Sequence, residues 1–169
     1  MTPDMNDHQD SPARRALGHD AAERISAGCY GALVSASTLI GLGNAELSDV
    51  IAVVALTNVV YFATHVFAYS LGDVSSKRPW QIVRHHLAVG APMVSVTFLP
   101  LLVVVVLSAA GADLQTALLW GVGVAMTYLV VVATAGARLR GYPAVAVVLT
   151  AIGSVVISGL LIVAKLLLH

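Results

Sequence analysis

The stretch that decides the fold reads VIAVVALTNVVYFATHVFAYSLG, from Val50 to Gly72. It is almost wholly apolar and, at about 20 residues per crossing, it is long enough to span a bilayer as one helix. Asn58, Tyr61, His65 and Tyr69 interrupt it at intervals of three or four residues, a spacing that places them on one helical face. Because polar groups are costly in the hydrocarbon core, this face is predicted to turn toward protein or a water-filled cavity.

The composition of the whole chain indicates a membrane protein. Hydrophobic residues make up 58% of its 169 residues and charged residues 11%, against about a quarter charged in a soluble domain. The single cysteine, Cys29, permits no internal disulfide, and no Cys/His spacing of a structural zinc site is present. We therefore expect an all-α polytopic membrane protein whose principal partner is the lipid bilayer.

Four further segments on either side of this stretch have the length and hydropathy of a membrane crossing. Residues 1–23 are polar and lack periodicity, which predicts a cytoplasmic tail ahead of a transmembrane domain at 24–169. Segment 76–88 combines basic residues, Trp80 and apolar positions at helical spacing, which predicts an interfacial helix ending at a bend near Pro92. The five transmembrane helices are expected at about residues 25–43, 50–72, 91–110, 114–135 and 144–164.

The distribution of basic residues orients these spans. Of the nine Lys and Arg residues, all but Lys165 fall on the N-terminal side of the five expected crossings. The positive-inside rule then predicts a cytoplasmic N-terminus and an external C-terminus, in the plasma membrane. The eight residues on the N-terminal side are Arg14, Arg15, Arg24, Lys77, Arg78, Arg84, Arg138 and Arg140.

Small residues recur every fourth position in the first and fifth spans, which gives faces suited to close helix packing. We expect these faces to pack helices together and to offer a route to a homo-oligomer. They consist of Ala27, Gly31 and Ser35 in the first span, and of Ala146, Thr150, Ser154 and Ser158 in the fifth.

The acidic residues argue against several functions. All nine lie outside the expected hydrocarbon core, so we expect no buried carboxylate to act as a general acid, a proton relay or a ligand for a hard metal ion. The sequence contains no nucleophile elbow, phosphate-binding loop or stretch suited to nucleic acid. The chain is therefore expected not to be an enzyme, to need no cofactor and to have no nucleic-acid partner.

The polar face of the second span carries the main functional hypothesis. His65 is its side chain that titrates near neutral pH, and with Asn58, Tyr61 and Tyr30 from the first span it is predicted to line a transport path for a proton or a borderline metal ion. Two other interpretations stay open: His65 as a neutral histidine bonded to a neighbouring helix, and Asn58 as an interhelical hydrogen-bonding group. In that case the chain is a non-transporting accessory or scaffold protein.

The candidate metal ligands are His65, His85, His86 and Asp73. Adjacent residues on a helix point about 100° apart, so His85 and His86 are not expected to share one ion readily. Solvation of both imidazoles at the membrane interface is the simpler interpretation.

Several short segments resemble, in order, the vacuolar iron transporter family: Tyr30-Gly31, HVFAYSLG at 65–72, FLPL at 98–101 and GARLRG at 136–141. The resemblance implies five spans, a cytoplasmic N-terminus and a dimer. The transport acids of that family are replaced by Tyr30 and by the region of His65 and Tyr69, so iron transport does not carry over. The alternative is a small bacterial membrane protein of another kind.

Overall fold

A computed structural model of the chain describes residues 12–43, 45–74 and 78–168, and over these residues it is entirely helical, without strands. The expected all-α class is thereby confirmed. Three of the helices, α2, α3 and α4, are long and apolar enough to cross a membrane. The five helices are α1 (Pro12–Gly41), α2 (Leu47–Gly72), α3 (Pro79–Ala109), α4 (Leu114–Leu139) and α5 (Ala144–Leu168).

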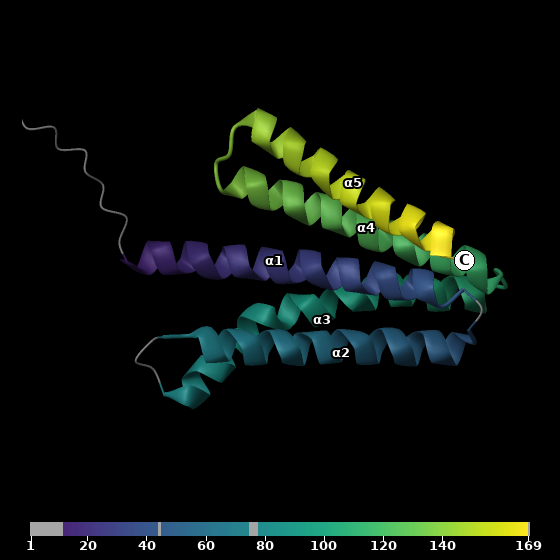
Figure 1. Ribbon diagram of the computed structural model, residues 1–169, viewed down its shortest axis with the longest axis horizontal. Coiled ribbons are helices and arrows are strands. Elements are labelled where there is room, and N and C mark those ends of the chain that lie inside the picture. The colour runs from purple at the N-terminus through teal and green to yellow at the C-terminus, as the bar shows by residue number, and fades with distance from the viewer. Residues whose placement is uncertain (1–11, 44, 75–77, 169) are drawn as a thin grey trace, which may run out of the picture.

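The helices form an up-and-down bundle around α1 (Figure 1). α1 packs against both α3 and α4, whereas α2 packs chiefly on α3, and α5 packs on α4. Successive helices reverse direction, so the α2–α3 and α4–α5 turns lie at one end of the bundle. We call this the basic end, because Arg78 and Arg140 lie in its two turns and Arg138 lies in the last turn of α4.

The apolar core lies where α1, α2, α3 and α4 meet. In the described part of α5 the buried residues are Val147 and Ser158 alone, so that helix lies at the edge of the bundle. Large apolar side chains such as Leu56, Phe67 and Leu119 remain exposed, as the outer surface of a membrane bundle requires. The core consists of Ala32, Ala36, Leu39, Val50, Val54, Val96, Val104, Ala117, Leu118, Val122, Ala125, Met126 and Leu129.

α1 approaches α3 closely at Gly31. A Cβ added there would overlap the backbone carbonyl of Met93 and lie 2.9 Å from its Cα. Ala27 and Ser35, the other small residues of the α1 face, are also buried. The predicted close approach of helices at this face is therefore observed within the chain, where absent side chains let two backbones meet.

Two expected boundaries need correction. The interfacial helix predicted at 76–88 is not a separate element from Pro79 onward, because α3 runs without a break from Pro79 to Ala109, through Pro92; residues 76 and 77 lie outside the described residues. Near Gly90, where a bend is expected, α2 packs closely against the continuous helix. A Cβ added at Gly90 would lie 3.1 Å from Phe62 Cε2 and 3.5 Å from His65 Cδ2. Neighbouring helices can in this way support a helix through a proline.

The second correction concerns the predicted tail. α1 begins at Pro12 and continues without interruption into the expected first span, so residues 12–23 belong to this helix; residues 1–11 lie outside the described part. The helix carries Asp20 and Glu23 up against α3.

Local capping fixes the turn between α3 and α4. Gly111 takes the left-handed conformation, with φ of 89°, which a residue with a side chain rarely adopts. Asp113 follows as the N-cap of α4, and its Oδ2 accepts a hydrogen bond from the Thr116 N–H at 2.9 Å. This backbone hydrogen bond lowers the pKa of the Asp113 carboxyl from its ordinary value.

Candidate functional site

The polar side chains near the middle of α1, α2 and α3 form a closed set, which we call the polar trio: Ser35, Asn58 and Thr97. Ser35 Oγ donates to the Gly31 carbonyl at 2.8 Å and lies 3.4 Å from Asn58 Oδ1 and 3.0 Å from Thr97 Oγ1. Asn58 Nδ2 donates to the Val54 carbonyl at 2.9 Å. Ser35 and Asn58 are fully buried, so the trio joins three helices without access to water.

Two further residues of the predicted path lie apart from Asn58. Tyr30 and Tyr61 form a pair across α1 and α2, with ring centroids 5.9 Å apart. Their exposed fractions are 46% and 43%, so this pair lies at the surface of the chain. The sequence-predicted set of Asn58, Tyr61, His65 and Tyr30 is therefore divided between a buried contact and an exposed aromatic pair.

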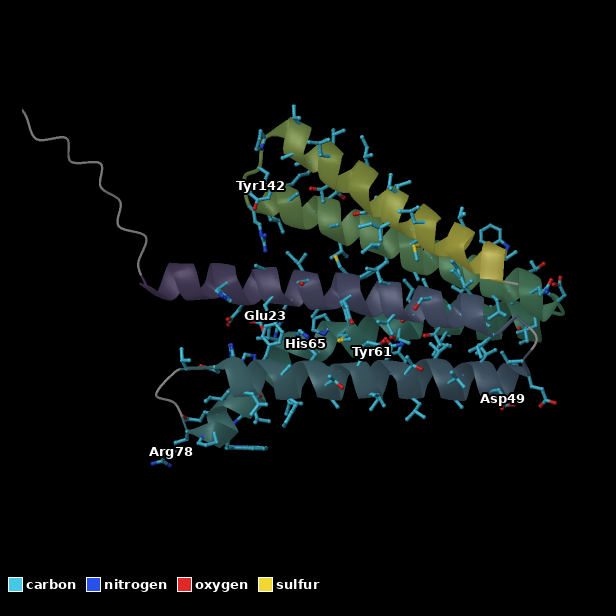
Figure 2. All side chains as sticks on the ribbon, in the orientation of Figure 1. Glu23, Asp49, Tyr61, His65, Arg78 and Tyr142 are labelled. Carbon is cyan, nitrogen blue, oxygen red and sulfur yellow. The ribbon has the colours of Figure 1, made fainter. Side chains whose placement is uncertain are left out.

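His65 connects the aromatic face of α2 to the basic end. Its ring stacks on Tyr69 with centroids 4.3 Å apart, and Tyr69 lies 5.8 Å from the ring of His86 on α3. Figure 2 shows Glu23, His65 and Tyr61 succeeding one another along the bundle, from the basic end toward Asp49 at the opposite end. The rings of His86, Tyr69 and His65 thus form a series that runs from α3 at the basic end to the middle of α2.

His86 lies between two carboxylates at the basic end. Its Nδ1 is 3.4 Å from Glu23 Oε1, and its Nε2 is 3.5 Å from Asp73 Oδ2. The side chains of His86 and Glu23 are 9% and 10% exposed. The expectation that no carboxylate is buried is therefore wrong at Glu23, because packing of α1 on α3 covers a residue that the sequence placed in a tail.

Three more titratable residues surround this pair. His85 Nε2 lies 3.6 Å from Asp20 Oδ1, and His19 Nδ1 lies 4.0 Å from Glu23 Oε2. Ligand-type atoms of Glu23, His85 and His86 all lie within 4.8 Å of one another. The two adjacent histidines thus lie near the same carboxylate despite their divergent backbone directions, because each imidazole can rotate about its own side-chain torsions.

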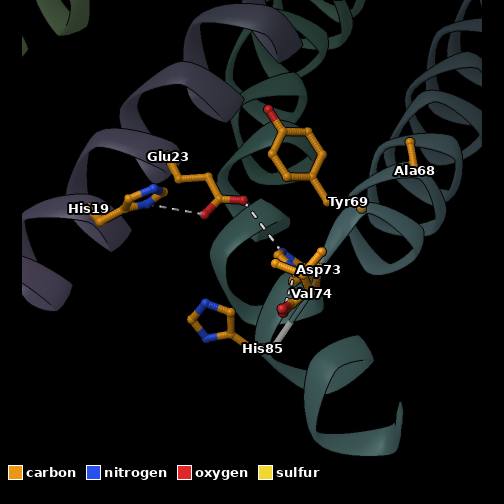
Figure 3. Close-up of a pocket in the computed structure, with 9 residues that line it drawn as sticks. His19, Glu23, Ala68, Tyr69, Asp73, Val74 and His85 are labelled. Atoms are coloured by element: carbon orange, nitrogen blue, oxygen red, sulfur yellow. Dashed lines mark ion pairs between the residues drawn. The ribbon is translucent and has the colours of Figure 1, made fainter. Parts of the chain in front are cut away.

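A pocket with a volume of about 600 Å³ opens beside this cluster (Figure 3). Glu23 and His19 reach it from α1, Tyr69 from α2 and His85 from α3. Tyr69 lines the pocket, and the ring of His65 lies against that of Tyr69, with centroids 4.3 Å apart. Of the sequence-predicted metal candidates, the structure therefore brings together Asp73, His85 and His86, and places His65 one aromatic ring away.

The cluster is unusual because several of its buried polar atoms have no hydrogen-bond partner among the described residues. Among the described residues, neither ring nitrogen of His86 has a hydrogen-bond partner, and nor does Glu23 Oε1. Buried polar atoms are almost always paired, since leaving one unpaired costs about 1–3 kcal/mol. The neighbouring carboxylates lie at ion-pair distance from His86 but outside hydrogen-bond geometry.

Glu23, Asp20 and His19 are the site residues that sequence reasoning missed. A signal for Glu23 was present: it precedes Ala27, Gly31 and Ser35 at the same spacing of four residues, and so continues the small-residue row of α1. The facing row on α3 contains His86, Met93 and Thr97, and the two rows meet at 23–86, 31–93 and 35–97. Asp20 and His19 share no comparable pattern.

Comparisons with protein-family models, with curated proteins and with solved structures find no match to this chain. The resemblance to the vacuolar iron transporter family therefore stays a prediction.

Proposed function

We propose that this chain is a five-span protein of the plasma membrane, with a cytoplasmic N-terminus, that transports a small cation, either a metal ion or a proton. Three helices with the length and hydropathy of a membrane span support the membrane assignment. The turns that carry Arg78 and Arg140 lie at the same end of the bundle, as does the last turn of α4 with Arg138, which agrees with the topology expected from the positive-inside rule. In this proposal the chain has no enzymatic activity.

The observation that carries the proposal is the ring series that leads from the pocket into α2. Glu23 and Asp73 give the pocket a negative potential that concentrates cations, and His86, Tyr69 and His65 follow one another at ring distances of 5.8 and 4.3 Å. Imidazole can bind a metal ion or carry a proton near neutral pH. A cation entering at the basic end would thus pass Tyr69 and reach His65.

Beyond His65 the proposed path follows the exposed pair of Tyr61 and Tyr30. These rings lie between α1 and α2 and stay accessible, whereas Asn58 is fully buried in the polar trio. The structure therefore favours Asn58 as the interhelical hydrogen-bonding group and leaves His65, Tyr61 and Tyr30 for transport.

Flux into liposomes tests this proposal. The purified chain is reconstituted with a metal-sensitive or pH-sensitive dye inside the vesicles, and uptake is followed after a Zn²⁺ or a proton gradient is imposed. We expect His65→Ala to lower the initial rate at least about tenfold, a typical lower limit for the loss of a positioned proton-transfer or ligand group.

Thr64→Ala is the matched control, since Thr64 adjoins His65, is exposed and bonds only to the Val60 carbonyl of its own helix. It should leave flux unchanged. Equal flux in the parent and in His65→Ala, or none in the parent under either gradient, would contradict the proposal.

The polar trio supports a second candidate function, a non-transporting accessory or scaffold membrane protein. Its three side chains satisfy one another across α1, α2 and α3, which is what a chain needs in order to present a fixed surface to a partner. Absence of flux in the parent, together with a folded and stable bundle, would favour this alternative.

A further inference from the structure

We propose that Glu23, His85 and His86 bind one divalent transition-metal ion, with Asp73 supporting His86 from outside the ligand set. This inference deepens the proposed function, on which it rests, because it names the transported cation as a metal ion of the Zn²⁺, Fe²⁺ and Co²⁺ class.

The geometry of the three side chains suits such an ion. Donor atoms around a tetrahedral metal with bonds of about 2.1 Å are about 3.4 Å apart, and Glu23 Oε1 lies 3.4 Å from His86 Nδ1. One ligand-type atom each of Glu23, His85 and His86 lies within 4.8 Å of the other two. Because the His85 side chain is 32% exposed, it has room to complete the set by a small rotation.

The unpaired atoms of the cluster are the second, independent observation. His86 is more than nine-tenths buried, and both of its nitrogens and Glu23 Oε1 lack hydrogen bonds within the described chain. Coordination through His86 Nδ1 and Glu23 Oε1 would give two of these atoms a partner. A metal ion thus accounts for an arrangement that is otherwise costly to bury.

Asp73 supplies the carboxylate that a metal-bound histidine ordinarily has beside its other ring nitrogen. Its Oδ2 is 3.5 Å from His86 Nε2, close enough for a small side-chain rotation to let it accept the Nε2–H and so keep Nδ1 unprotonated for the metal. This carboxylate–histidine–metal order is the usual second shell of a histidine ligand. Asp20 stands in the same relation to His85, at 3.6 Å from its Nε2.

The donor set selects the class of ion. Two imidazoles and one carboxylate suit Zn²⁺, Fe²⁺ or Co²⁺, whereas Ca²⁺ and Mg²⁺ prefer ligands that are all oxygen. The charge of a divalent ion also balances the two carboxylates nearest to His86, Glu23 and Asp73. The side facing the pocket stays open, so a bound ion can exchange, as a transport site requires and a closed structural site does not.

Metal titration of the detergent-solubilised full chain, with any affinity tag removed, tests the site. Co²⁺ is followed by its visible absorption and Zn²⁺ by calorimetry. We expect one ion per chain, and a loss of affinity of at least about tenfold in Glu23→Gln and His86→Gln. Asp73→Asn should weaken binding by about 10–100-fold, as is usual for outer-shell partners. Saturating Zn²⁺ should raise the unfolding midpoint of the parent and not that of Glu23→Gln.

Glu46→Gln is the matched control for Glu23→Gln. Glu46 is exposed and precedes α2 at the opposite end of the bundle, where its side chain makes no capping hydrogen bond, so its substitution should leave the affinity unchanged. Failure of the parent to bind Co²⁺ or Zn²⁺ overturns the inference, as does equal affinity in the parent and Glu23→Gln, or a loss in Glu46→Gln with none in His86→Gln. Metal binding without flux contradicts transport alone, and proton flux without metal binding contradicts the metal site alone.

Discussion

The two polar regions along the α1–α3 contact differ in how their hydrogen-bonding capacity is used. In the polar trio, Ser35, Asn58 and Thr97 satisfy one another and nearby carbonyls at 2.8–3.4 Å. At the basic end, Glu23 and His86 are almost as deeply buried, yet their facing atoms make no hydrogen bond. The two regions therefore differ little in burial. They differ in whether the donors and acceptors of their buried side chains are hydrogen-bonded.

The comparison also shows how one helix contact supports both regions. The same rows of α1 and α3 bring Glu23 to His86, Gly31 to Met93 and Ser35 to Thr97. The register of α1 on α3, set at Gly31, thus also fixes the contacts of Glu23 with His86 and of Ser35 with Thr97.

The largest expected effect comes from breaking that register with Gly31→Ala. The new Cβ would overlap the Met93 backbone, which cannot move aside as a flexible side chain would, so α1 must shift from α3. We expect a loss of about 1–3 kcal/mol in the free energy of unfolding, as for an overpacked core, together with weaker Co²⁺ binding. Unfolding of the chain in mixed micelles and Co²⁺ titration measure the two effects.

Gly123→Ala is the control for this change, because no atom lies within 4 Å of a Cβ added there. Alanine favours a helix over glycine by about 1 kcal/mol, so this variant should be neutral or slightly more stable. Equal stability of the two variants would contradict the close contact of α1 and α3.

A smaller effect is expected from Asn58→Ala, which opens the polar trio without touching the basic end. Interhelical hydrogen bonds in membranes contribute about 0.6 kcal/mol on average and up to about 1.7 kcal/mol, so a loss of about 1 kcal/mol in the free energy of unfolding is expected. Thr64→Ala, which removes an exposed hydroxyl on the same helix, should cost little.

The affinity for Co²⁺ should not change in Asn58→Ala. A variant that kept its stability and lost the metal would reverse the roles assigned to the two regions.

The smallest effect is expected at Asp113. Its capping hydrogen bond is exposed, unlike the polar trio and the Glu23–His86 contact, which are both buried. Its pKa is lowered in the folded chain by the hydrogen bond from Thr116 N–H, so the ionised cap stabilises the start of α4 fully above about pH 5, where an unfolded Asp is also ionised. That stabilisation is lost as the pH falls through the folded pKa.

Hydrogen exchange at the Thr116 amide measures this dependence on pH. Asp113→Asn keeps an acceptor at the cap but cannot titrate, so the ratio of exchange rates between the parent and this variant should change only at acidic pH. A ratio that stayed constant down to the lowest pH would show that the cap does not depend on its charge.

Much of the fold could be predicted from the sequence because apolar periodicity and length are local properties. The helices at α2, α4 and α5 begin or end within a few residues of the predicted spans, and the close packing at Gly31 follows from the small residues around it. The continuous α3 could not be predicted in this way, since Gly90 and Pro92 favour a bend unless Phe62 and His65 pack against the helix.

The candidate site was predicted only in part. Asp73, His85 and His86 were recognised by residue type, but Glu23 was assigned to a tail, although it continues the row of Ala27 and Gly31 by the same step of four residues. Nor does the sequence predict that Asn58 is buried while Tyr30 and Tyr61 are exposed. Residues on one face of an isolated helix share a direction, but their neighbours decide which of them are covered.

The sequence by itself determined an all-helical chain with apolar segments of membrane length and with its basic residues gathered at one end, since hydropathy, helix length and charge are set residue by residue. Only the tertiary structure decided that Glu23 meets His86 and that Ser35 meets Asn58 and Thr97. These pairs are 63, 23 and 62 positions apart in the chain. The register of α1 on α3 brings Glu23 to His86 and Ser35 to Thr97, and the packing of α2 adds Asn58. That register depends on how closely two backbones can approach at a residue without a side chain.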